Sequence, residues 1–157
     1  MATGQVSSIS DDNWQLVATN TTTSGTTFTF SSLSGYKKYM LVWDTIVTTA
    51  NSQIYLTFNS SSTNYSGVSS GDGLNSGLYY TSRINLSAYN NTLHAGHIYI
   101  DYVNQTAPKI VDGHFNDNSV GGFVKGMWNG GSAVTSIVIT SSSAFTSGSV
   151  SLYGIAA

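Results

Sequence analysis

Apolar and polar residues alternate with a period of two along most of the 157-residue chain. In the segment 38–48, Tyr39, Leu41 and Trp43 fall on one face and the residues between them fall on the other. Side chains of a β-strand point alternately to opposite faces, so this pattern predicts a strand. The same signal predicts ten strands in all, at residues 14–18, 26–30, 38–48, 53–59, 77–84, 94–103, 108–116, 120–128, 134–140 and 148–155.

Turn residues separate these segments. Ser34-Gly35 precedes the strand at 38–48, and Asn129-Gly130-Gly131 divides two later strands. No window repeats apolar residues with helical spacing, and only 87–91 has the character of a single helical turn. Many short strands without helices predict an all-β fold, a jelly-roll-like antiparallel β-sandwich of about 8–10 strands.

The pattern also divides the chain into regions. We expect an N-terminal arm at 1–13, which is too polar for a core strand, and a single sandwich domain at 14–157. Residues 60–76 are rich in Gly and Ser and predict a long loop, a natural contact element. Exposed sheet edges are usually protected by charge or proline, and this chain has little of either. We therefore expect its edges to be covered by a neighbouring molecule.

Composition strengthens that expectation. Charged residues make up 8% of the chain, with five basic and seven acidic residues and no Glu, whereas a typical soluble domain is about a quarter charged. Hydroxyl and amide side chains supply the polar surface instead. Because surface charge normally keeps proteins apart, a chain that lacks it is expected to pack against companions.

Several classes of partner and site are not expected. The five basic residues are scattered apart from one adjacent pair, which argues against nucleic acid. The chain has no Cys, and we expect no cofactor and no metal site. Its first residues lack the features of a signal peptide, and no stretch approaches the roughly 18 apolar residues of a membrane span, so no membrane partner is expected.

Motifs of catalytic chemistry are weak. Gly67-Val68-Ser69-Ser70-Gly71 matches G-x-S-x-G, but the flanks predict a loop rather than a strand and a helix. His94 and His97 would diverge on a strand, because odd offsets point to opposite faces. Asp112 and His114 share a face and could form a structural hydrogen bond. Asp44 and Asp101 could approach each other, but the sequence does not require it. We expect no enzyme.

Aromatic side chains near turns and strand ends, together with acidic residues of the arm and the loop, are the candidate contact residues, because Tyr and Trp combine a large rigid area with a polar tip. Packing at the ends of the sandwich is the alternative role for the aromatic ones. The interface candidates are Asp11, Asp12, Trp14, Tyr65, Asp72, Tyr79, Tyr80 and Trp128.

One stretch runs from Phe28 to Trp43 and continues in Ile54–Asn59 and Ser62–Ser66, and a second is Phe145–Ile155, which ends in Leu-Tyr-Gly-Ile. Both stretches resemble accessory virion proteins of tailed bacteriophages. Together they cover about a third of the chain. Similar β-sandwich modules of that group serve as capsid cement, head fibres and tail-fibre tips. Ser60 and Ser61 stand where the group usually has an acidic residue and a glycine, so no function of that loop carries over.

The resemblance implies a structural virion protein. We expect a homotrimer that decorates the outer surface of a phage capsid, bridges copies of the major capsid protein and is made in the host bacterial cytoplasm. The arm and residues 60–76 are the expected contacts with the shell. The alternative is a tail-fibre tip or receptor-binding module that recognises host surface glycan, and the third hypothesis is a glycan-cleaving enzyme.

Overall fold

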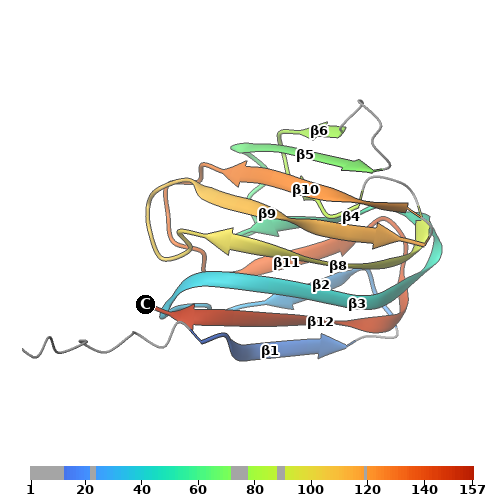
Figure 1. Cartoon of the computed structure of the whole chain (residues 1–157), viewed down its shortest axis with the longest axis horizontal. Coiled ribbons are helices and arrows are strands. Elements are labelled where there is room, and N and C mark those ends of the chain that lie inside the picture. Colours follow the sequence, from blue (N-terminus) through green and yellow to red (C-terminus); the bar gives the residue numbers. More distant parts are fainter. Residues whose placement is uncertain (1–12, 22–23, 72–77, 88–90, 119) are drawn as a thin grey trace, which may run out of the picture.

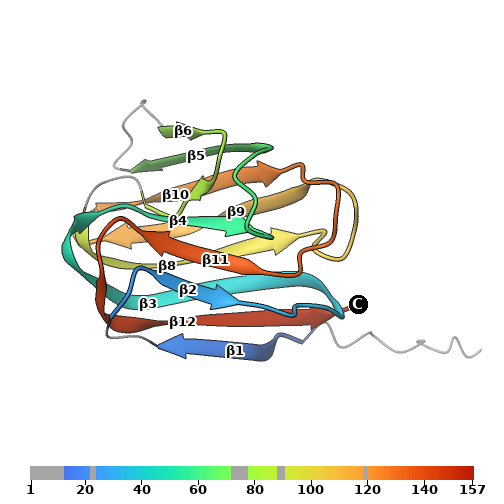
Figure 2. The ribbon, with the colours of Figure 1, turned by 180° about the vertical axis from the view of Figure 1, so that it is seen from behind.

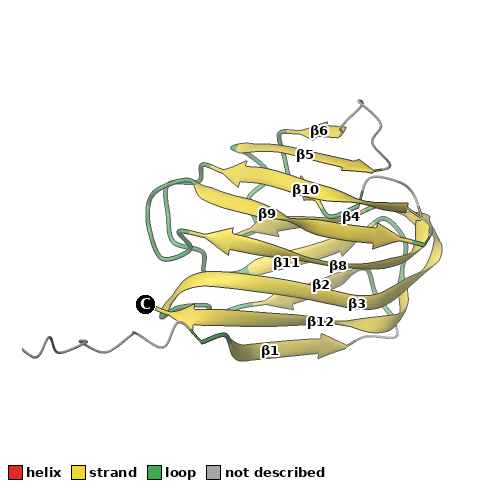
Figure 3. Cartoon of the chain, in the orientation of Figure 1, coloured by secondary structure: helices red, strands yellow, loops and turns green. Residues whose placement is uncertain are grey.

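The computed structural model describes residues 13–21, 24–71, 78–87, 91–118 and 120–157. Within these ranges the chain forms twelve β-strands and no helix (Figures 1 and 3). The strands are β1 (Gln15–Thr21), β2 (Thr27–Phe30), β3 (Tyr36–Ser52), β4 (Ile54–Phe58), β5 (Tyr65–Gly71), β6 (Leu78–Tyr80), β7 (Ile84–Asn85), β8 (Asn91–Asp101), β9 (Lys109–Asp117), β10 (Val120–Trp128), β11 (Ile137–Ser141) and β12 (Phe145–Ala156).

The described strands form two antiparallel sheets that pack face to face as a β-sandwich. The larger sheet has the order β1-β12-β3-β8-β9-β10-β5-β6, and the smaller has the order β2-β11-β4-β7. Figure 1 shows the larger sheet in front, and Figure 2 shows the smaller one. The all-β sandwich predicted from the alternation is therefore confirmed.

The connectivity is that of a jelly roll with two insertions. The strand quartets β1-β12-β3-β8 and β2-β11-β4-β7 lie in opposite sheets, and the chain crosses between the sheets from β1 to β4 at every step. Such double-sheet crossing defines a jelly roll. The pairs β5–β6 and β9–β10 extend the larger sheet beyond the eight-strand pattern, which explains why the strands outnumber the predicted 8–10.

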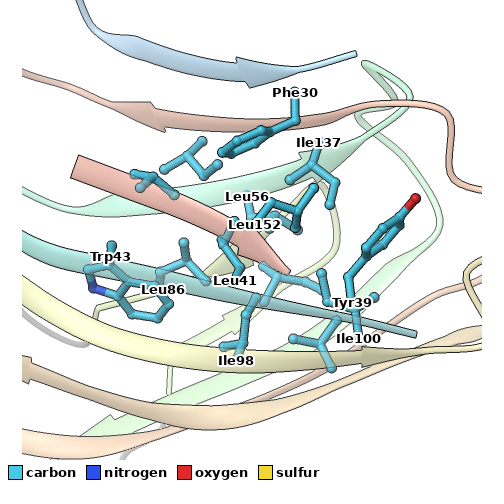
Figure 4. Packing of buried hydrophobic residues seen from close by; sticks show 14 of the residues in the cluster. Phe30, Tyr39, Leu41, Trp43, Leu56, Leu86, Ile98, Ile100, Ile137 and Leu152 are labelled. Atoms are coloured by element: carbon cyan, nitrogen blue, oxygen red, sulfur yellow. The ribbon is translucent and has the colours of Figure 1, made fainter. Parts of the chain in front are cut away.

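The core lies between the two sheets. Tyr39, Leu41 and Trp43 of β3 are almost completely buried, as their alternation predicts. They face side chains of the smaller sheet, including Leu56 and Ile137 (Figure 4). Alternate residues of β2, β4, β9 and β11 are buried, so the sandwich follows from the period-two pattern.

One loop prediction and one strand prediction are wrong. The predicted loop at 60–76 contains β5, which pairs with β10 along its whole length, with Val68 opposite Lys125. Its small polar residues have weak strand propensity, and pairing with β10 overrides it. The strand predicted at 77–84 is divided between β6 in the larger sheet and β7 in the smaller. Residues 1–12, 72–77 and 88–90 lie outside the described residues, so the arm at 1–13 stays a prediction.

Gly154 in β12 shows the close approach that a glycine inside a strand suggests. A Cβ atom at this position would overlap the aromatic ring of Tyr36. Tyr36 packs in turn on Tyr39, with ring centroids 5.5 Å apart. The glycine of the C-terminal Leu-Tyr-Gly-Ile sequence therefore seats an aromatic side chain against the last strand.

Two buried tyrosines make the free energy of unfolding depend on pH in the alkaline range. Burial raises the pKa of both Tyr39 and Tyr65 to about 12 from 10.0. A folded-state pKa above the unfolded value gives stability that is complete below pH 10 and is lost as the pH rises toward 12. Each tyrosine contributes at most about 1.4 kcal/mol per pH unit there. Burial lowers the pKa of Lys109 from its usual value of 10.5. This shift makes the free energy of unfolding rise with pH below about pH 10.5, which is opposite to the effect of the two tyrosines.

We expect the free energy of unfolding, measured in urea, to fall between pH 10 and 12. Tyr65→Phe removes one of the two tyrosines with a raised pKa and should roughly halve the slope, and Tyr102→Phe, which removes the hydroxyl of an exposed tyrosine, is the matched control. A slope that is identical in the wild type and in Tyr65→Phe would contradict this assignment.

Candidate functional site

Ser69 of the G-x-S-x-G match has the surroundings of a structural residue. It lies in the middle of β5 rather than on a turn between a strand and a helix. Its side chain is 1% exposed, and its hydroxyl donates a hydrogen bond to the carbonyl oxygen of Ser87 at 3.1 Å. A nucleophilic serine needs an exposed oxygen beside a general base, and Ser69 is buried in a strand.

His94 and His97 point to opposite faces of β8, as their odd spacing predicts. His94 is fully buried, with Nδ1 2.8 Å from Oδ1 of Asp117 and Nε2 3.0 Å from the carbonyl oxygen of Asn91. The amide of Asn91 donates to the carbonyl of Asp117 at 2.9 Å. This cluster ties the start of β8 to the end of β9, which is a structural role for the histidine.

Among the described carboxylates, Asp44 and Asp101 do not approach each other as a pair. Asp101 lies opposite Lys38, and their charged atoms are 2.9 Å apart. Asp44 lies opposite Ser149 of β12. It is six residues from Lys38 along β3, and it therefore lies roughly 20 Å from the Lys38–Asp101 pair. Asp112 faces Tyr99 across the strand pair, whereas His114 faces His97. The described residues contain no group of three or more potential metal-ligating side chains.

Two of the interface candidates are core residues. Tyr65 is 4% exposed and Trp128 is 2% exposed, and their rings stack with centroids 6.1 Å apart. Trp128 also packs on Phe58 at 5.5 Å. Their side chains are therefore not available to a partner, which corrects the contact role expected for them. Sequence alternation is ambiguous here because both residues stand at strand ends beside turns.

The other interface candidates have different outcomes. Asp11, Asp12 and Asp72 lie outside the described residues. Tyr79 and Tyr80 belong to β6, where their backbones lie opposite Val68 and Gly67. Trp14 precedes β1 and is half-buried, and its ring lies 5.9 Å from that of Tyr99. Tyr99 points away from the core, so Trp14 belongs to the solvent-facing side of the larger sheet.

Asn59 and Tyr65 make hydrogen bonds that hold the fold together. The amide of Asn59 donates to the carbonyl of Ala133 at 2.8 Å, and its oxygen accepts from the backbone N–H of Thr135 at 2.8 Å. The hydroxyl of Tyr65 accepts a hydrogen bond from the backbone N–H of Phe58 at 2.7 Å. These contacts fix the turn after β4 and the segment before β11, so Asn59 and Tyr65 are structural in this chain.

The outer face of the larger sheet, the side turned away from the smaller sheet, is unusually apolar. Among the residues whose side chains the structure describes, five large hydrophobic ones on this face are between 36% and 59% exposed. They are Leu16, Tyr99, Ile110, Phe123 and Met127. The strand register places Met127 directly opposite Ile110, and Phe123 lies on the same face of β10 as Met127. Leu16 lies in the same cross-strand row as Tyr99, with Tyr153 and Met40 between them.

The outer face of the smaller sheet is different. Thr27 and Thr29 of β2 lie opposite Thr140 and Val138 of β11, and Val138 lies opposite Thr57 of β4. The hydroxyl groups of these rows form hydrogen bonds with water readily. The contrast between the two faces identifies the larger sheet as the side that gains most from being covered.

Charges on the outer face of the larger sheet nearly cancel. Lys38 forms an ion pair with Asp101 and lies 5.4 Å from the ring centroid of Tyr99. Lys125 lies opposite Asp112 in the β9–β10 pair. Each of these lysines therefore has a carboxylate as its neighbour, and a protein surface brought close would meet little net charge. The amino-acid sequence already indicates this apolar outer face, because both alternating sets of residues in β3 are apolar, whereas a strand with one solvent-facing side usually has one apolar and one polar set.

A small cleft lies at one end of the larger sheet. It has a volume of about 400 Å³ and is lined by residues that include Asp101, Tyr102 and Gln105. Tyr102 is 48% exposed and has a positive φ of 62°. The loop that follows is held by Lys109, which is fully buried and donates to the carbonyl oxygens of Gln105 at 2.6 Å and Ala107 at 2.7 Å. Sequence reasoning missed this lysine, although its parity in the predicted strand at 108–116 places it on the same face as Val111 and Phe115 and was the signal for its burial.

Comparisons of the chain with protein-family models, with curated proteins and with solved structures find no match. No helix in the described part of the chain is long and apolar enough to cross a bilayer.

Proposed function

We propose that this protein is a homotrimeric decoration protein of a tailed-phage virion, on the outer surface of the capsid, where it bridges subunits of the major capsid protein. The observation that carries the proposal is the apolar, nearly neutral outer face of the larger sheet. Within each trimer this face packs against a neighbouring copy of the same chain.

The size of this face supports contact with another copy. The six strands from β1 to β10, each about 4.8 Å wide, span roughly 30 Å, and the residue rows with exposed apolar side chains extend roughly 20 Å along them. The resulting area of about 600 Å² is near the roughly 800 Å² that each partner buries in a standard stable interface. Charge is compatible with this occupant, because a face that pairs each lysine with a carboxylate carries little net charge to repel the different surface that a neighbouring subunit of a cyclic trimer presents.

The proposed mechanism is mechanical. Trimers seated over junctions between coat subunits add buried area across each junction, and symmetry repeats that gain over the whole shell. The resemblance of Phe28–Trp43 and Phe145–Ile155 to accessory virion proteins supports the phage setting. The sparse charge of the chain, at 8%, agrees with a surface that stays in contact with neighbours.

A receptor-binding tip that recognises host glycan is the second candidate, favoured by the cleft beside Tyr102. An exposed aromatic ring next to a carboxylate and an amide is a combination suited to sugars, because the ring stacks on C–H groups and the polar groups bind hydroxyls. Asp101 and Gln105 supply the two polar groups.

Electron cryo-microscopy of the intact particle tests the proposal. The decoration role predicts trimeric density on the outer head surface in many copies per capsid. Density confined to the tail tip, together with glycan-array binding that is lost in Tyr102→Ala and kept in Tyr55→Ala, would contradict it and favour the receptor-binding role. Absence from purified particles would contradict both.

A further inference from the structure

We propose that His97 and His114 form a two-histidine binding site for a divalent transition-metal ion, represented by Zn²⁺, on the outer face of the larger sheet. The two residues come from neighbouring strands, β8 and β9, and lie directly opposite each other in the antiparallel pair. Neither contributes to the core, and neither takes part in the His94–Asp117 cluster.

The spacing of the two rings suits chelation. Their centroids are 5.7 Å apart, and their planes are inclined at 42°. A zinc ion binds imidazole nitrogens at about 2.0–2.1 Å in tetrahedral geometry, which places the centroids of two ligating rings about 5 Å apart. Small side-chain rotations close the difference, and the backbone need not move, since residues directly opposite in a sheet already hold their Cβ atoms about 5 Å apart.

The nitrogens of these rings are available. No hydrogen bond from the described residues engages either imidazole, whereas His94 uses both of its nitrogens. The contacts of His97 are with rings, those of His114 and of Tyr99 at 5.6 Å. Both histidines are at least partly exposed to solvent. A metal ion can therefore reach the pair, and binding it breaks no protein hydrogen bond.

The surroundings select the class of ion. Val42 and Phe123 flank the histidines in the same cross-strand row, so the pair offers nitrogen ligands between apolar neighbours. Imidazole favours Zn²⁺, Cu²⁺ and Ni²⁺ over the oxygen-seeking Mg²⁺ and Ca²⁺. Asp112 lies two residues from His114 on the same face and adds negative charge, which Lys125 opposite it partly offsets. Water fills the remaining coordination positions.

The site does not require the proposed function, because both ligands belong to one chain. Its position inside the face proposed for subunit contact means that a bound ion would lie between copies in the trimer. The ion's open coordination positions would then face the neighbouring subunit.

Titration of the untagged full chain with ZnCl₂ by calorimetry at pH 7.5 tests the site. We expect one zinc ion per chain, reversed by a chelator, and no corresponding heat with MgCl₂. Loss of a group that only orients a metal ligand already costs about 10–100-fold in affinity, so His97→Gln and His114→Gln should each weaken binding at least about tenfold. Asn116→Gln, an exposed residue on the same face of β9, should leave the affinity unchanged.

Unchanged zinc affinity in the double variant His97→Gln, His114→Gln would overturn the proposal, and so would the absence of binding by the wild type at about 100 μM of each component. Thermal unfolding of the variants verifies that they are folded. A monomeric outer-face variant, Ile110→Glu with Met127→Lys, separates this site from the trimer. It should still bind one zinc ion, whereas loss of binding there would show that the site needs the assembled contact and would overturn its assignment to one chain.

Discussion

The double variant Ile110→Glu, Met127→Lys is expected to sediment as a monomer under conditions in which the wild type is a trimer. The two residues lie directly opposite each other in the β9–β10 pair and are 40% and 36% exposed. The introduced charges pair within one chain, so the isolated fold and the net charge are preserved. Association must desolvate both charges, which we expect to raise the dissociation constant at least about 100-fold, or roughly 2.7 kcal/mol.

A matched control exists on the other sheet. Val138 and Thr57 also lie directly opposite each other, in the β11–β4 pair, on the hydroxyl-rich outer face. The variant Thr57→Lys, Val138→Glu introduces the same two charges in the same geometry. We expect it to remain a trimer by sedimentation velocity. Dissociation of the control together with a persistent trimer in Ile110→Glu, Met127→Lys would place the contact on the smaller sheet and contradict the proposal.

Lys109→Met is expected to lower the free energy of unfolding by about 3 kcal/mol, because hydrogen bonds to a charged group are worth about 1.5–3 kcal/mol each. The ammonium group is fully buried, donates to two carbonyl oxygens and lies 5.6 Å from the ring centroid of Trp128. Methionine has a similar length and keeps the packing, but it leaves both carbonyls without their donor. Urea denaturation measures the loss.

Lys125→Met is the control for this prediction. Lys125 is exposed on β10, so we expect its replacement to change the unfolding free energy by less than about 0.5 kcal/mol. The loop after Tyr102 depends on Lys109, so amide hydrogen exchange between residues 102 and 108 should accelerate in Lys109→Met alone. Equal stability of the two variants would contradict a structural role for Lys109.

Much of the sandwich follows from the period-two pattern. Strand β3 combines an inward set, Tyr39, Leu41 and Trp43, with an outward set, Met40 and Val42, and the amino-acid sequence alone separates the two sets. The divergence of His94 and His97 follows from the same parity. The close approach at Gly154 is also predictable, because a glycine inside an otherwise apolar strand signals crowding.

The sequence could not predict the features that depend on long-range pairing. Strand β5 consists largely of Ser and Gly, and only the partner strand β10 makes it a strand. Trp128 looks like a surface aromatic beside a turn until Tyr65 and Phe58 close over it. The facing of His97 and His114 depends on the β8–β9 register, which residues 17 positions apart in the chain do not reveal.

Sedimentation equilibrium of the wild-type chain at micromolar concentration is the most direct test of a covered outer face. The account predicts a single species with a mass near three times 16.6 kDa. A monodisperse species of 16.6 kDa, with Ile110, Phe123 and Met127 open to solvent, would contradict it.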